Sequence, residues 1–183
     1  GSFALWGSGE SIQDADIEQI ISLPHITSVQ KTAETLYAGN SLESPINPGR
    51  LGRQTNQWIR SQFSKIPVII MGFEPSNTAP TLLGGGSAEI TQGRYFYLNE
   101  SDADVALLGQ ALATKNNLDL GSIININGSD VEIIGIFTSG QVFGDSVLIM
   151  PFTTVNRLFE LSGTTSLTVE ADTVENVRLV ANS

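Results

Sequence analysis

The feature that most constrains the fold of this chain is a β-hairpin signal in its second half. Two segments rich in Ile and Val, residues 121–127 and 130–137, flank the dipeptide Asn127-Gly128. Both turn residues tolerate positive φ, which a two-residue turn between antiparallel strands requires. The signal therefore excludes a purely helical fold and predicts an antiparallel pair of strands.

The remaining elements are mixed along the chain. Segments whose apolar residues recur with helical spacing are expected to be helices: residues 11–23, 101–116, 153–161 and 172–183. Apolar or alternating runs of strand length are expected to be strands: residues 26–37, 66–73, 94–98, 147–150 and 166–170. Residues 39–65 and 74–87 are rich in Gly, Asn, Ser and Pro and are expected to be long loops. This mixture, with a hairpin in it, predicts an α+β fold.

Composition excludes several functional classes. The net charge is −10, from 9 Lys and Arg against 19 Asp and Glu, so charge-driven binding to nucleic acid or to anionic lipid is not expected. The chain has no Cys and a single His, which excludes thiol catalysis, disulfides, Fe–S clusters and ordinary zinc sites. No run approaches the 18 apolar residues that a membrane helix needs.

One acidic cluster has two interpretations. Glu100, Asp102 and Asp104 have the composition of a metal or acid–base site. The same residues fit a helix start, with Ser101 capping the amide of Asp104 and the acids near the positive helix end. The capping interpretation accounts for each residue and is favoured.

Other candidate motifs also favour a structural role. His25 follows Pro24 between a predicted helix and a predicted strand, and a lone His fits a turn better than a ligand or a base. The triplet at residues 84–86 is Gly-rich, but no Lys-Ser/Thr follows it as in a phosphate-binding loop. No nucleophile, base and orienting residue can be grouped, so the sequence predicts no enzyme, no cofactor and no metal.

A basic segment is the remaining candidate for function. Residues 50–65 hold four of the nine basic residues together with Trp58. Arg50, Arg53 and Trp58 are predicted to contact a partner protein. The alternative is a solvated loop whose Trp folds back onto the core.

An ordered series of short motifs resembles a known family. The series lies in residues 93–137, which read GRYFYLNESDADVALLGQALATKNNLDLGSIININGSDVEIIGIF. Its motifs, in order, are GR-F, an acidic helix start, V-LG, LA, G-I-ING and V-GI. The segment VLIMPFTTVNRLF follows. Upstream, LPHITSVQ and VIIMGFEP stand where the family has a helix, an outgoing strand and a Val-Ile-Gly strand. The series is similar to the extracytoplasmic, or periplasmic core, domain of MacB/FtsX-type ABC transporter permeases. Residues 39–65 have no counterpart in that pattern, so no partner-contact residue is carried over from the family.

The resemblance implies a two-lobed architecture. A porter-like α+β lobe, half of a ferredoxin-like fold, would comprise residues 3–75 and 164–183. A second, mixed β/α lobe carrying the hairpin would be inserted as residues 76–163. The chain starts without Met and ends inside a predicted helix, which fits a domain lying between two membrane helices of a longer permease.

The resemblance also implies a function. An ABC ATPase performs the chemistry, while the extracytoplasmic domain contacts a partner protein or exported substrate and relays motion for export, lipoprotein release or mechanotransmission. The domain would lie at the cell membrane on the extracytoplasmic side. We expect the excised domain to be monomeric, since it is acidic, and the full permease to be dimeric. The rival hypotheses are a free-standing secreted or cell-surface binding module and an enzyme that uses scattered carboxylates.

Overall fold

The computed structural model describes most of the chain. The described residues are 2–6, 12, 14–22, 26–47, 49, 53–63, 65–82 and 86–171. Arg50, His25, most of the glycine triplet and the helix predicted at 172–183 lie outside them. Among the helices of the described residues, none has both the length and the apolar character needed to cross a membrane.

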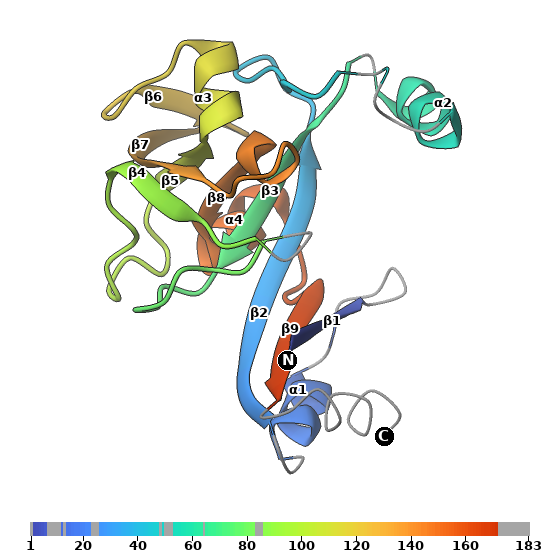
Figure 1. Ribbon diagram of the computed structural model, residues 1–183, viewed down its shortest axis with the longest axis vertical. Helices are drawn as coiled ribbons and strands as arrows, with labels where there is room; N and C mark the ends of the chain where they lie inside the picture. The colour runs from blue at the N-terminus through green and yellow to red at the C-terminus, as the bar shows by residue number, and fades with distance from the viewer. Residues whose placement is uncertain are drawn as a thin grey trace.

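A mixed β-sheet runs through the whole molecule (Figure 1). Its strands are β1 (Ser2–Trp6), β2 (Ile26–Tyr37), β3 (Val68–Phe73), β4 (Glu89–Gly93), β5 (Val105–Gly109), β6 (Ile123–Ile126), β7 (Ser129–Thr138), β8 (Val147–Pro151) and β9 (Ser166–Ala171). Its helices are α1 (Asp14–Ile21), α2 (Arg53–Gln62), α3 (Gln110–Asn116) and α4 (Phe152–Phe159), with a 3₁₀ turn, η2 (Gly144–Ser146). The strand order is β1-β9-β2-β3-β8-β5-β7-β4, and β6 pairs with β7. The α+β class predicted from the sequence is confirmed.

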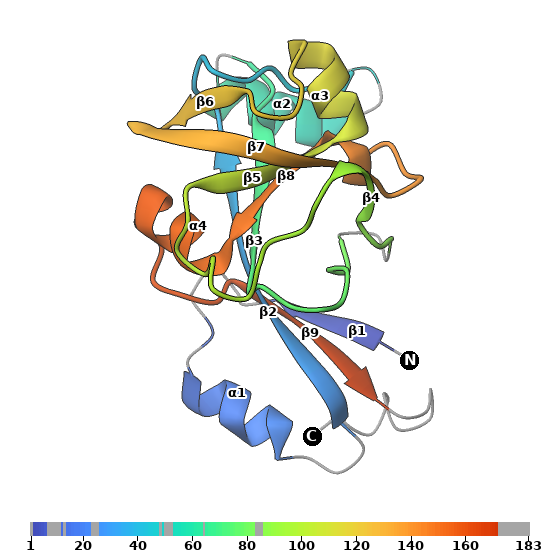
Figure 2. The same cartoon turned by 90° about the vertical axis from the view of Figure 1, so that its left-hand side faces the viewer.

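The long strand β2 connects two regions of this sheet (Figures 1 and 2). Its first half, from Ile26 to Thr32, pairs with β9, whereas Thr32 to Tyr37 pair with β3. Buried apolar residues form separate clusters in the two regions. One cluster contains Ile17, Leu167 and Val169 beside the first half of β2, and two larger ones lie within the rest of the sheet.

Local signals predicted several elements correctly. The hairpin forms as expected, with φ of 50° at Asn127 and 94° at Gly128. Strand β2 has the predicted bounds, β8 and β9 each extend one residue beyond theirs, and β3 begins two residues late. Helix α4 starts one residue earlier and ends two residues earlier than the predicted range 153–161, and its C-cap, Glu160, is left-handed with φ of 52°.

The predicted helix over 101–116 is wrong in its first half. Residues 105–109 form β5, which pairs in parallel with β7 and antiparallel with β8, and only 110–116 are helical. Ala106, Leu107 and Leu108 are all fully buried. A run that is apolar on both sides fits an interior strand, because neighbouring strands and covering layers bury both faces.

Three other predictions also need correction. Residues 39–65 are not all loop, because α2 lies within them; its few apolar residues give too weak a helical periodicity to be recognised. Residues 94–98 form no strand. The strand is β4, which ends at Gly93, where φ is +77° and an added Cβ would meet the carbonyl oxygen of Ile134. Strand β1 was not predicted, and it pairs with β9 at the edge of the sheet.

Candidate functional site

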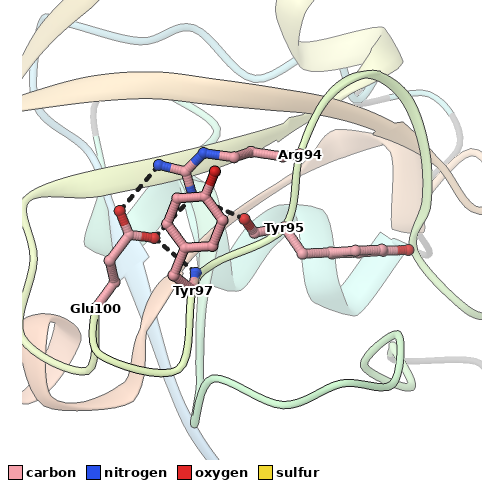
Figure 3. Close-up of polar contacts among 4 residues, drawn as sticks. All are labelled: Arg94, Tyr95, Tyr97 and Glu100. Carbon is pink, nitrogen blue, oxygen red and sulfur yellow. Dashed lines mark hydrogen bonds and ion pairs between the residues drawn. The ribbon is translucent and has the colours of Figure 1, made fainter.

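Residues 94–100 form a loop that is fixed by one ion pair, and we call it the pinned loop (Figure 3). Arg94 donates from Nη1 to Oε2 of Glu100 at 2.8 Å and from Nη2 to Oε1 at 2.9 Å. The amide of Tyr97 donates to the same carboxylate at 2.7 Å, and the Arg94 guanidinium lies 3.8 Å from the centroid of the Tyr97 ring. A bidentate pair with a cation–π contact restricts the loop to one geometry.

Electrostatics keep this pair ionised. The hydrogen bond from Arg94 is the main cause that lowers the pKa of Glu100 below its usual 4.5, and the same bond raises the pKa of Arg94. The Glu100 side chain is 18% exposed and that of Arg94 35%. The pair therefore stabilises the folded chain at neutral pH.

Replacing Glu100 by Gln is expected to destabilise the chain by about 1–2 kcal/mol at pH 7, since a neutral amide cannot replace a charged bidentate acceptor and the partial exposure of Arg94 screens the pair. The folded pKa is below 4.5, so this stabilisation is present above 4.5 and is lost as the pH falls below it. Urea unfolding at several pH values measures the difference. Glu18→Gln on the exposed surface of α1 is the control; an equal effect of the two substitutions would contradict a stabilising role for the pair.

The segment after the pinned loop is held by α4. Arg157 contacts Oδ1 of Asp102 at 3.0 Å and Oδ1 of Asp104 at 2.5 Å, and Thr154 Oγ1 donates to the Ala103 carbonyl at 2.8 Å. The predicted capping role of the two acids is wrong, because they lie in a turn before a strand and pair with Arg157. No metal-binding group of three or more His, Cys, Asp or Glu residues occurs in the described part of the chain.

The pinned loop exposes apolar surface beside a cavity. Tyr97 and Leu98 are 59% and 63% exposed although the loop around them is held in place. Tyr95 and Phe96, from the same loop, line a cavity of about 400 Å³. Large exposed apolar side chains on a fixed loop are typical of a protein-recognition surface.

The cavity lies between β2 and two loops. Its apolar wall includes the buried Phe73 and Leu107. Residues 28–31 of β2 form another wall, and residues 74–76 and 78–81 form the rim. The Gln30 side chain joins the β2 wall to the rim. Its Nε2 donates to the Thr81 carbonyl, and the Thr81 amide donates to its Oε1, both at 3.3 Å.

Two of the three predicted partner-contact residues are described, and both lie on α2. The helix stands away from the sheet (Figure 1), and Trp58 is 53% exposed, with its ring 6.0 Å from that of Phe63. Arg53 and Trp58 are five positions apart, which places them about 140° apart around the helix axis. Arg53 instead shares a face with Arg60, seven residues on. The structure therefore does not bring Arg53 and Trp58 together on one face.

The pinned loop and the cavity were not predicted as functional features. Arg94 and Glu100 lie six positions apart in a stretch that the sequence predicts as a strand and a helix start, and neither element by itself pairs two residues at this spacing. The local signal for this ion pair is an Arg and a Glu that flank a run of aromatic residues. The cavity has no local signal, because Gln30 and Thr81 are 51 positions apart.

Comparison with known proteins identifies the family. The model of the MacB-like periplasmic core domain matches residues 2–183. The chain belongs to this family. The resemblance found in the sequence is thereby confirmed, and the chain is a periplasmic or extracellular domain of an ABC transporter permease of the MacB type.

Solved structures show the same fold. The extracellular domain of the noncanonic ABC-type transporter YknZ from Gram-positive bacteria is 15% identical, with a TM-score of 0.64 over 98% of this chain and 86% of that one. The periplasmic region of MacB from Actinobacillus actinomycetemcomitans is 17% identical, with a TM-score of 0.61 over 98% of this chain and 79% of that one. No curated protein matches this sequence.

Proposed function

We propose that this chain is a non-catalytic domain that contacts a partner protein or exported substrate outside the membrane and relays ATP-driven motion of its permease. The family match over residues 2–183 carries the proposal. An ABC ATPase, as a subunit or a domain, supplies the energy, and the domain needs no cofactor. Its acidic charge favours a monomer when the domain is isolated, whereas the full permease acts as a dimer.

The position of the first and last described strands supports this role. Ser2 in β1 is the register partner of Glu170 in β9, so the start of the first described strand lies beside the end of the last. Membrane helices joined to these strands would leave the domain next to each other. A displacement of the helix before β1 would act on that strand, and a displacement of the helix after β9 would reach that strand through residues 172–183.

Partner contact is assigned to α2 and the segment before it, with Arg50, Arg53 and Trp58 as the predicted residues. Residues 44–73 contain no Asp or Glu, while the whole chain has a net charge of −10. Within the described residues, no carboxylate forms a salt bridge with Arg53 or Arg60. Exposed cations on a helix that stands away from an acidic body fit an acidic partner surface.

A topology experiment on the full reading frame tests the proposal. Ile123 is 66% exposed, and the chain has no Cys, so Ile123→Cys introduces one labelling site into this domain. Any cysteines elsewhere in the frame are replaced first. We expect a membrane-impermeant maleimide to label this site on intact cells or spheroplasts, in protein that stays in the membrane fraction.

The control is a cysteine-free protein, which gives no label. Labelling only after lysis would contradict exposure outside the membrane. Labelled protein recovered from the medium or from the soluble fraction would favour the secreted binding module.

A further inference from the structure

The sheet consists of two parts with separate cores. We call β1, β9, α1 and the first half of β2 the lower part, and the remaining elements the upper part, as they stand in Figures 1 and 2. In the lower part, Ile17 packs with Leu167 and Val169. No residue of this cluster belongs to either of the two upper clusters. Among the buried residues that the structure describes, no continuous apolar core joins the two parts.

Within the described residues the backbone passes between the parts at two places, and these lie side by side. One is at Thr32 in β2 and the other is at Thr165, just before β9. The Thr165 amide donates to the Thr32 carbonyl at 2.9 Å, and the Glu34 amide donates to Oγ1 of Thr165 at 2.7 Å. Two adjacent crossings define one axis about which the parts can turn.

The crossing is polar rather than apolar. Thr32, Thr164 and Ser166 are 2%, 2% and 4% exposed, so buried hydroxyl-bearing residues gather at this point. Ser166 Oγ donates to Oε1 of the half-buried Glu34 at 3.3 Å. Reorienting a few hydrogen-bonded residues disturbs fewer interdigitated side chains than a shift within a close-packed core does.

The cavity lies across this crossing. Residues 28–31 of β2 belong to the lower part, whereas Phe73, the 74–81 loop and Tyr95 belong to the upper part. Gln30 is the lower-part side chain whose amide holds both main-chain groups of Thr81. Turning the parts about the crossing must change the width of the cavity and strain or break these two hydrogen bonds.

We propose that Thr32 and Thr165 form a hinge between the two parts, with the cavity as the space that opens and closes and the Gln30–Thr81 bonds as its latch. The relay of motion through this hinge rests on the proposed function above. The hinge itself is a property of the isolated chain. This joint and its latch would carry a displacement applied at β1 and β9 toward the pinned loop.

Distance measurements between spin labels test the hinge in the isolated domain. Ile21→Cys in α1 and Ile123→Cys in β6 place one label on each part at exposed positions, in a chain without other cysteines. Adding Gln30→Ala removes the latch. We expect the distance distribution of this pair to widen and its mean to move, with Gln30→Glu intermediate because it keeps an acceptor for the Thr81 amide but loses the donor.

Two controls separate hinge motion from general loosening. A label pair within the upper part, Gln110→Cys with Ile123→Cys, is expected to keep its distribution when Gln30 is replaced. Gln92→Ala, an exposed glutamine of β4, is expected to change neither pair. An unchanged Ile21–Ile123 distribution in both Gln30 variants would overturn the hinge, as would equal widening of both pairs. Either result leaves the topology experiment on the full permease unaffected, so the two proposals fail independently.

Discussion

Replacing Gly109 by Ala is expected to destabilise the chain by about 3 kcal/mol or more, near the upper end of the cost of overpacking a core. Gly109 has φ of −60°, a conformation that Ala adopts freely, so its backbone causes no strain. An added Cβ would instead overlap the main-chain carbonyl of Asp145, which cannot move aside like the end of a flexible side chain. Urea unfolding of the two proteins measures the difference.

Gly121 provides the matched control. Its φ is +79°, and an added Cβ would meet nothing within 4 Å. Gly121→Ala therefore costs only the strain of the left-handed conformation, about 1 kcal/mol. Equal effects at the two positions would contradict the role of close backbone approach at Gly109.

This approach of Gly109 to Asp145 also supports the segment before β8. The carboxylate of Asp145 accepts from the Ser139 amide at 2.6 Å and from Ser139 Oγ at 2.9 Å. The turn at residues 139–146 therefore has one geometry, set partly by its own hydrogen bonds and partly by β5. Gly109→Ala would therefore disturb both this turn and its contact with β5.

The sequence predicted those elements whose stability is local. Asn127-Gly128 sets the hairpin turn by its own conformational freedom, and the apolar runs on either side set the strands. The end of β8 and the start of α4 were equally predictable, because Pro151, the N-cap of α4, has no amide hydrogen to donate within a strand or a helix. These signals depend on neighbours along the chain and need no tertiary contact.

The errors come from positions where tertiary neighbours decide between two local possibilities. Leu108 and Leu112 are four residues apart, as on a helix face, but Leu107 is equally buried and the flanking strands β7 and β8 favour an extended chain. Strand β1 depends on an edge that β9 supplies at least 160 positions later. No periodicity within these segments carries that information.

The candidate site divides in the same way. The family motif around Arg94 was visible in the sequence, and the pairing of Arg94 with Glu100 is local. The latch between Gln30 and Thr81 brings together a strand and a loop, and it exists only because β2 continues past the end of β3. The orientation of Arg53 relative to Trp58 depends on residues 53–62 being helical, which their few apolar residues do not indicate.

Replacing Phe137 by Ala is expected to cost about 3–5 kcal/mol, the range for removing a fully buried aromatic side chain. Phe137 is 0% exposed and lies in the same cluster as Phe73 and Leu107, which form the apolar wall of the cavity. The loss would therefore weaken the wall of the cavity as well as the upper core. Phe143→Ala is the matched control, because Phe143 is 50% exposed, and it should cost less than about 1 kcal/mol. Near-equal urea unfolding midpoints for the two variants would mean that the cluster around Phe137 adapts to the loss of the ring. The apolar wall of the cavity would then not depend on packing against Phe137.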